Sequence, residues 1–104
     1  MIDTFAFINI LSMEIKELEK ILKALGDINR LRILGDMAAA GGSIQCAQIM
    51  HVTQLAQPSV SHHIKSLTEA GLIIPEKDGR HYSYLLNKEL IKEFIGQLDE
   101  LVGK

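Results

Sequence analysis

Residues 57–71 read QPSVSHHIKSLTEAG, and their spacing predicts a helix with one packed side and one polar side. Proline is tolerated in the first turn of a helix and glycine suits the position just past its end, so Pro58 and Gly71 mark its limits. At 3.6 residues per turn, the side that must face the core gathers Val60, Ile64 and Leu67. The opposite side carries hydroxyl, imidazole and ammonium groups, and this polar surface calls for an explanation.

The segments around this helix predict a short helix before it and a β-hairpin after it. Residues 44–50 suit one short helix, with Ser43 as a possible cap. The runs LIIPE at 72–76 and HYSYLL at 81–86 are strand-like, and the polar loop KDGR separates them. Pro75 indicates that the first strand is an edge strand or ends early. A short helix, a turn, a helix and a hairpin together make a winged helix-turn-helix.

Two helices are predicted ahead of this unit and one after it. An amphipathic pattern over 13–25 ends at Gly26, Asp27 can cap a second helix, and Asn87 can cap the last one. The expected fold is mainly α with a small β-hairpin. It has about five helices plus a two-stranded wing, in one dimeric winged helix-turn-helix domain over 13–104.

The first residues, 1–12, form an apolar extension that we expect to be helical and to pack on a neighbour or a partner chain. They are too short to span a bilayer, and Asp3 with no preceding positive charge is unlike a signal peptide. The single cysteine, Cys46, cannot form an intrachain disulfide. These features predict a protein of the reducing cytoplasm without membrane contact.

The net charge of −2 means that any phosphate-binding surface must be a local patch. A recognition helix presents outward side chains near its N-terminus to base edges in the major groove of DNA. On the polar side of 57–71 the candidates are Gln57, Ser59, Ser61, His62 and Lys65. His63 lies about 100° round from His62 and is expected to be drawn towards the core. The alternative is an ordinary amphipathic helix with a solvated polar side.

The hairpin tip carries a second set of candidates, Lys77, Arg80 and His81. A basic tip beside a recognition helix is what a wing needs to hold flanking phosphates. The alternative is a plain solvated turn. Together the two sets predict that the partner is double-stranded DNA.

The last helix is apolar at seven of the thirteen positions over 90–102, more than one core-facing stripe requires. Such a surplus predicts a partner surface, and a twofold homodimer is the commonest solution. The alternative is that these residues only cover their own chain. The predicted dimer residues on the first and last helices are Ile15, Leu18, Leu22, Leu90, Ile91, Phe94, Ile95, Leu98 and Leu101.

Three motifs in order resemble the ArsR/SmtB family of bacterial winged-helix repressors: ALGDINRLRIL, QPSVSHHIKSLTEAGLI and GRHYSYLL. The resemblance covers roughly residues 13–102. It implies a homodimer formed by the first and last helices that represses transcription from a palindromic operator. It also implies that Gln57, Ser59, Ser61 and His62 face DNA, with Arg80 in the wing. Ala56 departs from the serine often found there, and losing that cap costs about 1 kcal/mol.

Many members of that family release DNA when a metal or metalloid binds, but the ligands for such a site are not evident here. The family's thiolate sensors are similar in having a Cys-x-Cys pair at the start of the third helix, where this chain has Cys46 alone. Its last helix, where other family sites use histidines, has no histidine. One soft ligand per chain cannot complete a zinc, cadmium or arsenic(III) site. We therefore expect neither metal nor cofactor, and no pairing of nucleophile and base indicates an enzyme.

Two alternatives to a plain DNA-binding repressor remain. One is a winged helix used as a protein-interaction module, which the acidic net charge would favour. The other is a metal-responsive or thiol-responsive member of the same repressor family, the latter through single modification of Cys46 or a bridge between chains.

Overall fold

The computed structural model describes residues 13–103, apart from the side chains of Val52, Asp78 and His81, so the helix expected within 1–12 lies outside it. The described helices are α2 (Ile15–Leu25), α3 (Ile28–Ala39), α4 (Cys46–Thr53), α5 (Gln57–Glu69) and α6 (Lys88–Val102). The strands are β1 (Ser43–Gln45), β2 (Ile73–Asp78) and β3 (His81–Leu86). The predicted winged helix-turn-helix is confirmed.

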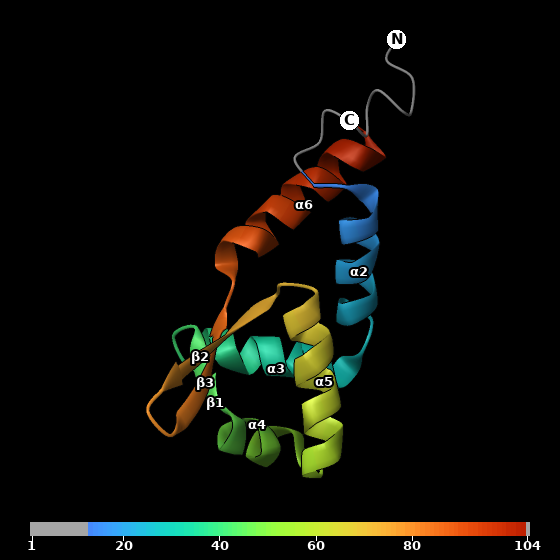
Figure 1. Ribbon diagram of the computed structural model, residues 1–104. Coiled ribbons are helices and arrows are strands. Elements are labelled where there is room, and N and C mark those ends of the chain that lie inside the picture. Colours follow the sequence, from blue (N-terminus) through green and yellow to red (C-terminus); the bar gives the residue numbers. More distant parts are fainter. Residues whose placement is uncertain (1–12, 104) are drawn as a thin grey trace.

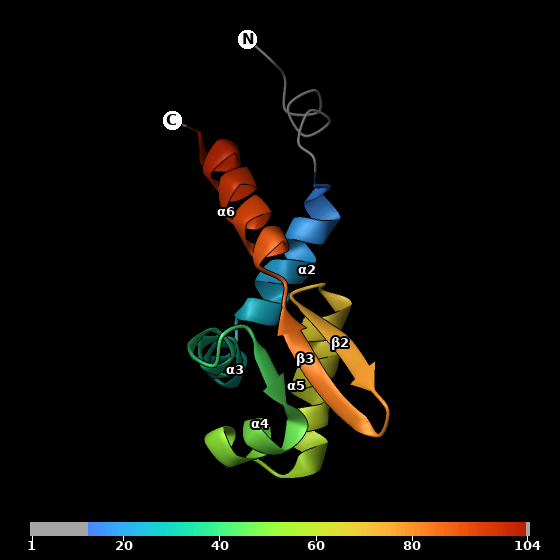
Figure 2. The ribbon, with the colours of Figure 1, turned by 90° about the vertical axis from the view of Figure 1, so that its left-hand side faces the viewer.

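The elements divide into two ends of an elongated molecule. Figures 1 and 2 both show α2 and α6 together at one end, and α4 with the start of α5 at the other. Helix α3, the rest of α5 and the sheet lie between them. The outer helices therefore project away from the helix-turn-helix.

The hairpin is tighter and longer than the sequence predicted. Strands β2 and β3 are antiparallel and pair as far as Asp78 with His81, so the connection is the two-residue turn Gly79-Arg80 instead of a four-residue loop. Gly79 has a φ of +62°, a left-handed conformation that glycine adopts without steric cost. Arg80 therefore lies on a short, defined turn, and Lys77 lies on strand β2 just before it.

A third strand corrects the prediction of a two-stranded wing. Strand β1 pairs with β3, and the order β1-β3-β2 leaves β2 at an edge, as Pro75 indicated. The short helix was predicted to begin at Ile44 with Ser43 as its cap, and this was wrong. Ile44 is a buried strand residue opposite Tyr84, and α4 begins only at Cys46, with Gln45 as its N-cap.

The turn between α4 and α5 is set by one residue in a rare conformation. Gln54 ends α4 with a φ of 59°, in the left-handed region that costs a residue with a side chain about 1–2 kcal/mol. Thr53, one residue earlier, donates its hydroxyl to the Ile49 carbonyl at 2.7 Å and accepts the Leu55 N–H at 3.4 Å. These bonds hold the reversal from which α5 runs back towards the middle of the molecule (Figure 1).

The predicted caps of α3 and α6 are confirmed. The Asp27 carboxylate accepts the N–H groups of Asn29 and Arg30 at the start of α3. The Asn87 side-chain oxygen accepts the Leu90 N–H, and its amide donates to the Gly71 carbonyl at 2.9 Å. Asn87 therefore begins α6 and also ties it to the end of α5.

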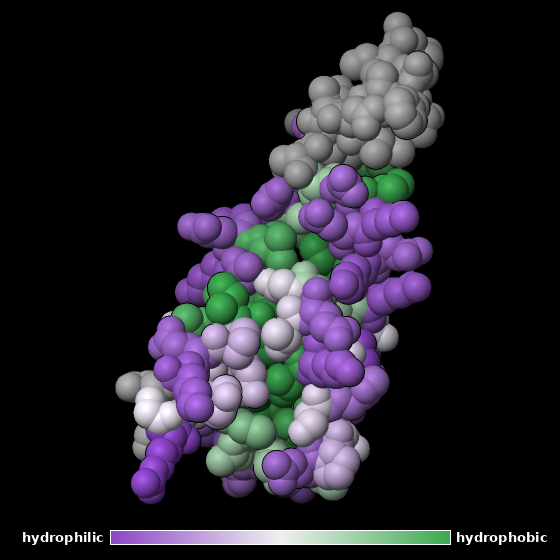
Figure 3. Space-filling model, in the orientation of Figure 1, coloured by the Kyte–Doolittle hydropathy of each residue, from purple (hydrophilic) through white to green (hydrophobic). Residues whose placement is uncertain are grey.

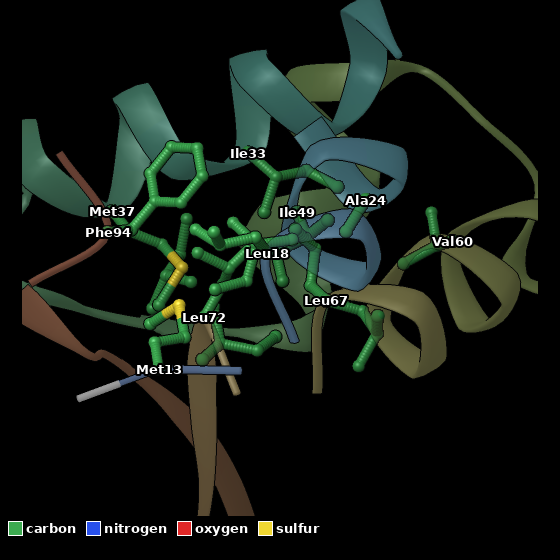
Figure 4. Packing of buried hydrophobic residues seen from close by; sticks show 14 residues of the cluster. Met13, Leu18, Ala24, Ile33, Met37, Ile49, Val60, Leu67, Leu72 and Phe94 are labelled. Carbon is green, nitrogen blue, oxygen red and sulfur yellow. The ribbon is translucent and has the colours of Figure 1, made fainter. Parts of the chain in front are cut away.

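One hydrophobic core joins all five described helices and the base of the sheet (Figure 4). The packed side predicted for α5 is confirmed, because Val60, Ile64 and Leu67 are all buried. The fully buried contributions from other elements include Leu18, Ile33, Met37, Ile49 and Leu72. With its apolar side held in this core, α5 must turn its polar side outward.

Candidate nucleic-acid interface

The polar side of α5 is exposed along the helix. The side chains of all five residues predicted to face DNA are exposed: Gln57, Ser59, Ser61, His62 and Lys65. Pro58 occupies the first turn of α5. The N-cap residue, Ala56, makes no side-chain hydrogen bond to the backbone of that turn. The start of a helix also carries a partial positive charge that favours phosphate. Donors, acceptors and positive charge thus share one face.

The two adjacent histidines have different environments, as helical geometry predicted. Their ring centroids are 5.9 Å apart with planes inclined by 55°. His62 is exposed, whereas His63 is only 9% exposed. The His63 Nδ1 atom accepts a hydrogen bond from Arg30 Nε at 3.1 Å. His62 is therefore available to a partner, while His63 belongs to the packing of α5.

The wing presents an exposed cation at its tip and another along β2. Both Lys77 and Arg80 are exposed, and the side chain of His81 lies outside what the structure describes. Sequence reasoning missed Tyr82, which pairs across the hairpin with Lys77. Tyr82 is 52% exposed, and the Lys77 ammonium lies 5.6 Å from the centre of its ring. Tyr82 could have been identified from the pairing of the two strands, because it is the residue of the second strand that lies directly across from Lys77.

The residues predicted to form a dimer fall into three groups by exposure. Four are exposed on α2 and α6: Ile15, Leu22, Ile95 and Leu101. Three are partly buried against the core: Leu90, Ile91 and Leu98. Leu18 and Phe94 are buried in the core of their own chain, so their side chains serve the fold itself.

Figure 3 shows apolar side chains between the hydrophilic outer sides of α2 and α6. Both helices expose large apolar side chains: Ile95 of α6 is 59% exposed and Leu22 of α2 is 48% exposed. Val102, which was not among the predicted residues, is exposed on the same helix as Ile95. The two outer helices therefore leave apolar side chains in solvent at the end of the molecule remote from α4.

Cys46 lies beside the wing and α5. The thiol is half-buried and contributes to a cavity of about 300 Å³, with Ser61 and Lys65 of α5 and Tyr84 of β3 also in its lining. Burial, with Cys46 and Tyr82 nearby, raises the pKa of the Tyr84 hydroxyl. Among the side chains that the structure describes, which exclude those of Asp78 and His81, no three His, Cys, Asp or Glu residues are placed to hold a metal ion.

None of the helices in the described part of the chain is long and apolar enough to cross a membrane.

Comparison with known proteins agrees with this geometry. Residues 27–74 match the model of a family described as bacterial regulatory protein, arsR family. The chain is 40% identical over 87 residues to the arsenical resistance operon repressor of Staphylococcus aureus, covering 84% of this chain and 82% of that protein. It is 41% identical over 91 residues to the repressor of the same name from Staphylococcus xylosus, covering 88% and 85%.

Solved structures share the fold. The crystal structure of an ArsR family transcriptional regulator superposes with a TM-score of 0.72 at 27% identity, covering 83% of this chain and 87% of that one. A homodimeric winged helix-turn-helix DNA-binding domain from Mycobacterium bovis, solved by NMR, has a TM-score of 0.66 at 22% identity, covering 80% and 77%.

Proposed function

Since the chain belongs to the ArsR family of bacterial regulatory proteins, we propose that it represses transcription by binding an inverted-repeat operator as a homodimer. It is a DNA-binding transcriptional regulator with a winged helix-turn-helix. The observation that carries the proposal is the exposed polar side of α5 beside an exposed basic wing, with the apolar side of the same helix buried.

Helix α5 is the reading helix in this proposal. Gln57 suits an adenine edge, and Ser59, Ser61 and His62 can donate to or accept from base edges or phosphates. Lys65 lies one turn beyond Ser61 and adds a full positive charge near the DNA backbone. Base contacts from the start of α5 would supply sequence preference.

The wing supplies affinity in this proposal. Lys77 and Arg80 are exposed at and next to a two-residue turn, and His81 begins the following strand. Phosphate contacts from such a tip fix the register of a protein on the duplex without reading sequence. Tyr82 adds a hydroxyl and a ring edge on the same hairpin.

The homodimer proposal rests on the exposed apolar side chains of α2 and α6. Ile15, Leu22 and Ile95 are large and solvent-exposed in the single chain. A twofold axis through this surface would bury them against their own copies and leave both reading helices outward. Two such helices enter successive major grooves when they are about 34–36 Å apart. The similar domain from Mycobacterium bovis is homodimeric.

The staphylococcal relatives are named for arsenical resistance, yet the donor set of this chain does not fit a metalloid. A site for arsenic(III) wants several soft thiolate ligands, and the chain has one cysteine. The repression proposed here therefore includes no metal-dependent or metalloid-dependent step. We place the protein in the cytoplasm with its operator and assign it no enzymatic activity.

A mobility-shift experiment tests the proposed function. The probe is the promoter fragment from the chain's own locus, with a scrambled fragment of equal length as control. We expect a shift at low salt that weakens steeply as salt rises, because phosphate contacts release condensed cations. Absence of any salt-dependent shift at low salt would overturn DNA binding and favour the protein-interaction alternative.

A further inference from the structure

A hydrogen-bonded network at the junction of α2 and α3 joins the reading helix to the end of α2. Arg30 donates from Nε to His63 Nδ1 at 3.1 Å and from Nη1 to the Lys23 carbonyl at 3.3 Å. One guanidinium on α3 thus contacts both α2 and α5. Arg30 and His63 are 33 positions apart in the chain, so the contact is tertiary.

Asp27 is the fourth member of this network. Its Oδ1 accepts the N–H groups of Asn29 and Arg30 at 2.8 and 3.2 Å and lies 3.9 Å from His63 Nδ1. Burial pushes the pKa of Asp27 upwards, but the backbone donors, with His63 and Arg30 nearby, outweigh burial and hold the pKa below its ordinary value. Asp27 is therefore a carboxylate at neutral pH.

The hydrogen bond from Arg30 fixes the orientation of the His63 ring. Nδ1 is the ring nitrogen that accepts this bond, which leaves Nε2 to carry the ring proton. The Asp27 carboxylate lies 3.9 Å from the same Nδ1 atom. Arg30 and Asp27 therefore both face one edge of the ring.

The groups that face His63 come from every side of this junction. Asp27 precedes α3, Arg30 lies on α3, and the His62 ring neighbours it on α5. From α2, Lys23 contributes its carbonyl to Arg30, while its ammonium is exposed and pairs with Glu19 at 3.7 Å. Asp27 thus places a carboxylate near the His63 ring, while the Lys23 ammonium is directed to Glu19.

We propose that His63 is a positioning residue: its Nδ1 atom accepts a hydrogen bond from Arg30 and so fixes α5 relative to α2. Because α2 belongs to the proposed dimer surface, this bond sets how the two reading helices face the DNA. The inference rests on the proposed function. Loss of the Arg30 hydrogen bond releases the tie to α2 and weakens operator binding.

The test compares the full-length chain with Arg30→Gln, which leaves the ring in place and removes the guanidinium. Arg32→Gln, an exposed arginine on the same helix, is the matched control. Affinity for the promoter fragment is measured at pH 8. We expect Arg30→Gln to bind about fivefold more weakly at pH 8, the equivalent of one hydrogen bond, and Arg32→Gln to bind like the wild type.

A fold measurement distinguishes positioning from general support of the fold. We expect circular dichroism to show that the wild type, Arg30→Gln and Arg32→Gln are all folded, so that the lower affinity of Arg30→Gln is not a loss of structure. A folded Arg30→Gln protein that binds as tightly as the wild type would overturn the proposal.

Nitrogen-15 NMR of the His63 imidazole separates this proposal from the proposed function. At pH 8 the structure requires an unprotonated Nδ1, and Arg30→Gln should shift the α5 amide resonances although position 30 lies on another helix. A ring protonated on Nδ1 at pH 8, or α5 amide resonances that do not shift in Arg30→Gln, would contradict the positioning role even if the chain binds DNA. If the wild type binds no promoter DNA, only the proposed function fails, and the NMR result still decides the network.

Discussion

His62 and His63 are neighbours in the chain whose rings lie 5.9 Å apart, yet one is exposed and the other is buried against Arg30. The division follows from helix geometry, because consecutive residues differ by about 100° in direction. One histidine is therefore exposed on the side of α5 that we propose faces DNA, while the next is bonded to Arg30 of α3. Substitutions at the two positions should have different consequences.

Replacing His62 by alanine should weaken operator binding by about 1–3 kcal/mol if its ring contacts a base edge. The same change should alter the free energy of unfolding by no more than about 0.5 kcal/mol, because the side chain is exposed. Fluorescence anisotropy with a labelled promoter fragment and urea unfolding measure the two effects. Unchanged affinity in the folded variant would remove His62 from the reading surface.

Replacing Lys65 or Arg80 by alanine should lower the slope of log affinity against log salt by about one each, since each is expected to neutralise a phosphate. Lys16→Ala is the matched control, because Lys16 is an exposed lysine on α2, away from the wing. Salt titrations of operator affinity measure the slopes. An equal reduction in the control would show that net charge, and not the placement of these residues, is responsible.

Ile95→Lys should convert the proposed dimer to monomers. The Ile95 side chain is 59% exposed in the single chain and is expected to contact the other copy in the dimer. A lysine there would bury its ammonium group in the interface. Ile74→Lys, at an exposed position on β2, is the control and should leave the assembly intact. Sedimentation velocity measures the mass. A monomeric wild type, or a dimeric Ile95→Lys protein, would reject this interface.

Ala56→Ser should stabilise the chain by about 1 kcal/mol, because it supplies a side-chain acceptor at an N-cap that makes no such hydrogen bond. Ala40→Ser is the control, since Ala40 ends α3 and serine offers no comparable gain at a C-cap. Urea unfolding gives both values. Equal effects at the two positions would show that the start of α5 is not limited by its cap.

Asp27→Ala should lower the free energy of unfolding by about 1 kcal/mol at pH 7 through loss of the α3 cap. The folded-state pKa of Asp27 lies below its ordinary value of 3.8, so its charge-dependent stabilisation is present above that value and is lost as the pH falls through the folded-state pKa. The difference between the proteins should therefore shrink in acid.

Unfolding in urea at pH 7 and pH 3 measures this change. Asp99→Ala, at an exposed position on α6, is the control and should show little difference at either pH. An Asp27→Ala deficit that stays constant across this range would mean that the carboxylate charge contributes nothing.

The features that could be predicted from sequence depend on residues close together in the chain. The packed side of α5 follows from the spacing of Val60 and Ile64, and the caps at Asp27 and Asn87 follow from residue type next to an apolar repeat. Each of these needs only one or two helical turns of sequence. The same reasoning placed His62 outward and His63 inward.

The features that were missed depend on distant parts of the chain. Strand β1 offers only one apolar residue, Ile44. It forms because it pairs with β3, a strand that comes after α5 in the sequence. The Arg30–His63 bond likewise joins residues 33 positions apart. Periodicity groups Phe94 with Ile95 as apolar, but only the tertiary packing decides that Phe94 is buried and Ile95 is exposed.

Hydroxyl-radical footprinting of the promoter fragment tests the central claim most directly, because it reports the dimer and the reading helix together. Two copies of α5 related by a twofold axis should protect two sites whose centres lie about 10–10.5 base pairs apart, on one face of the duplex. A single protected site at saturating protein, or two sites at a spacing that does not follow the helical repeat, would contradict a symmetric dimer that reads successive major grooves.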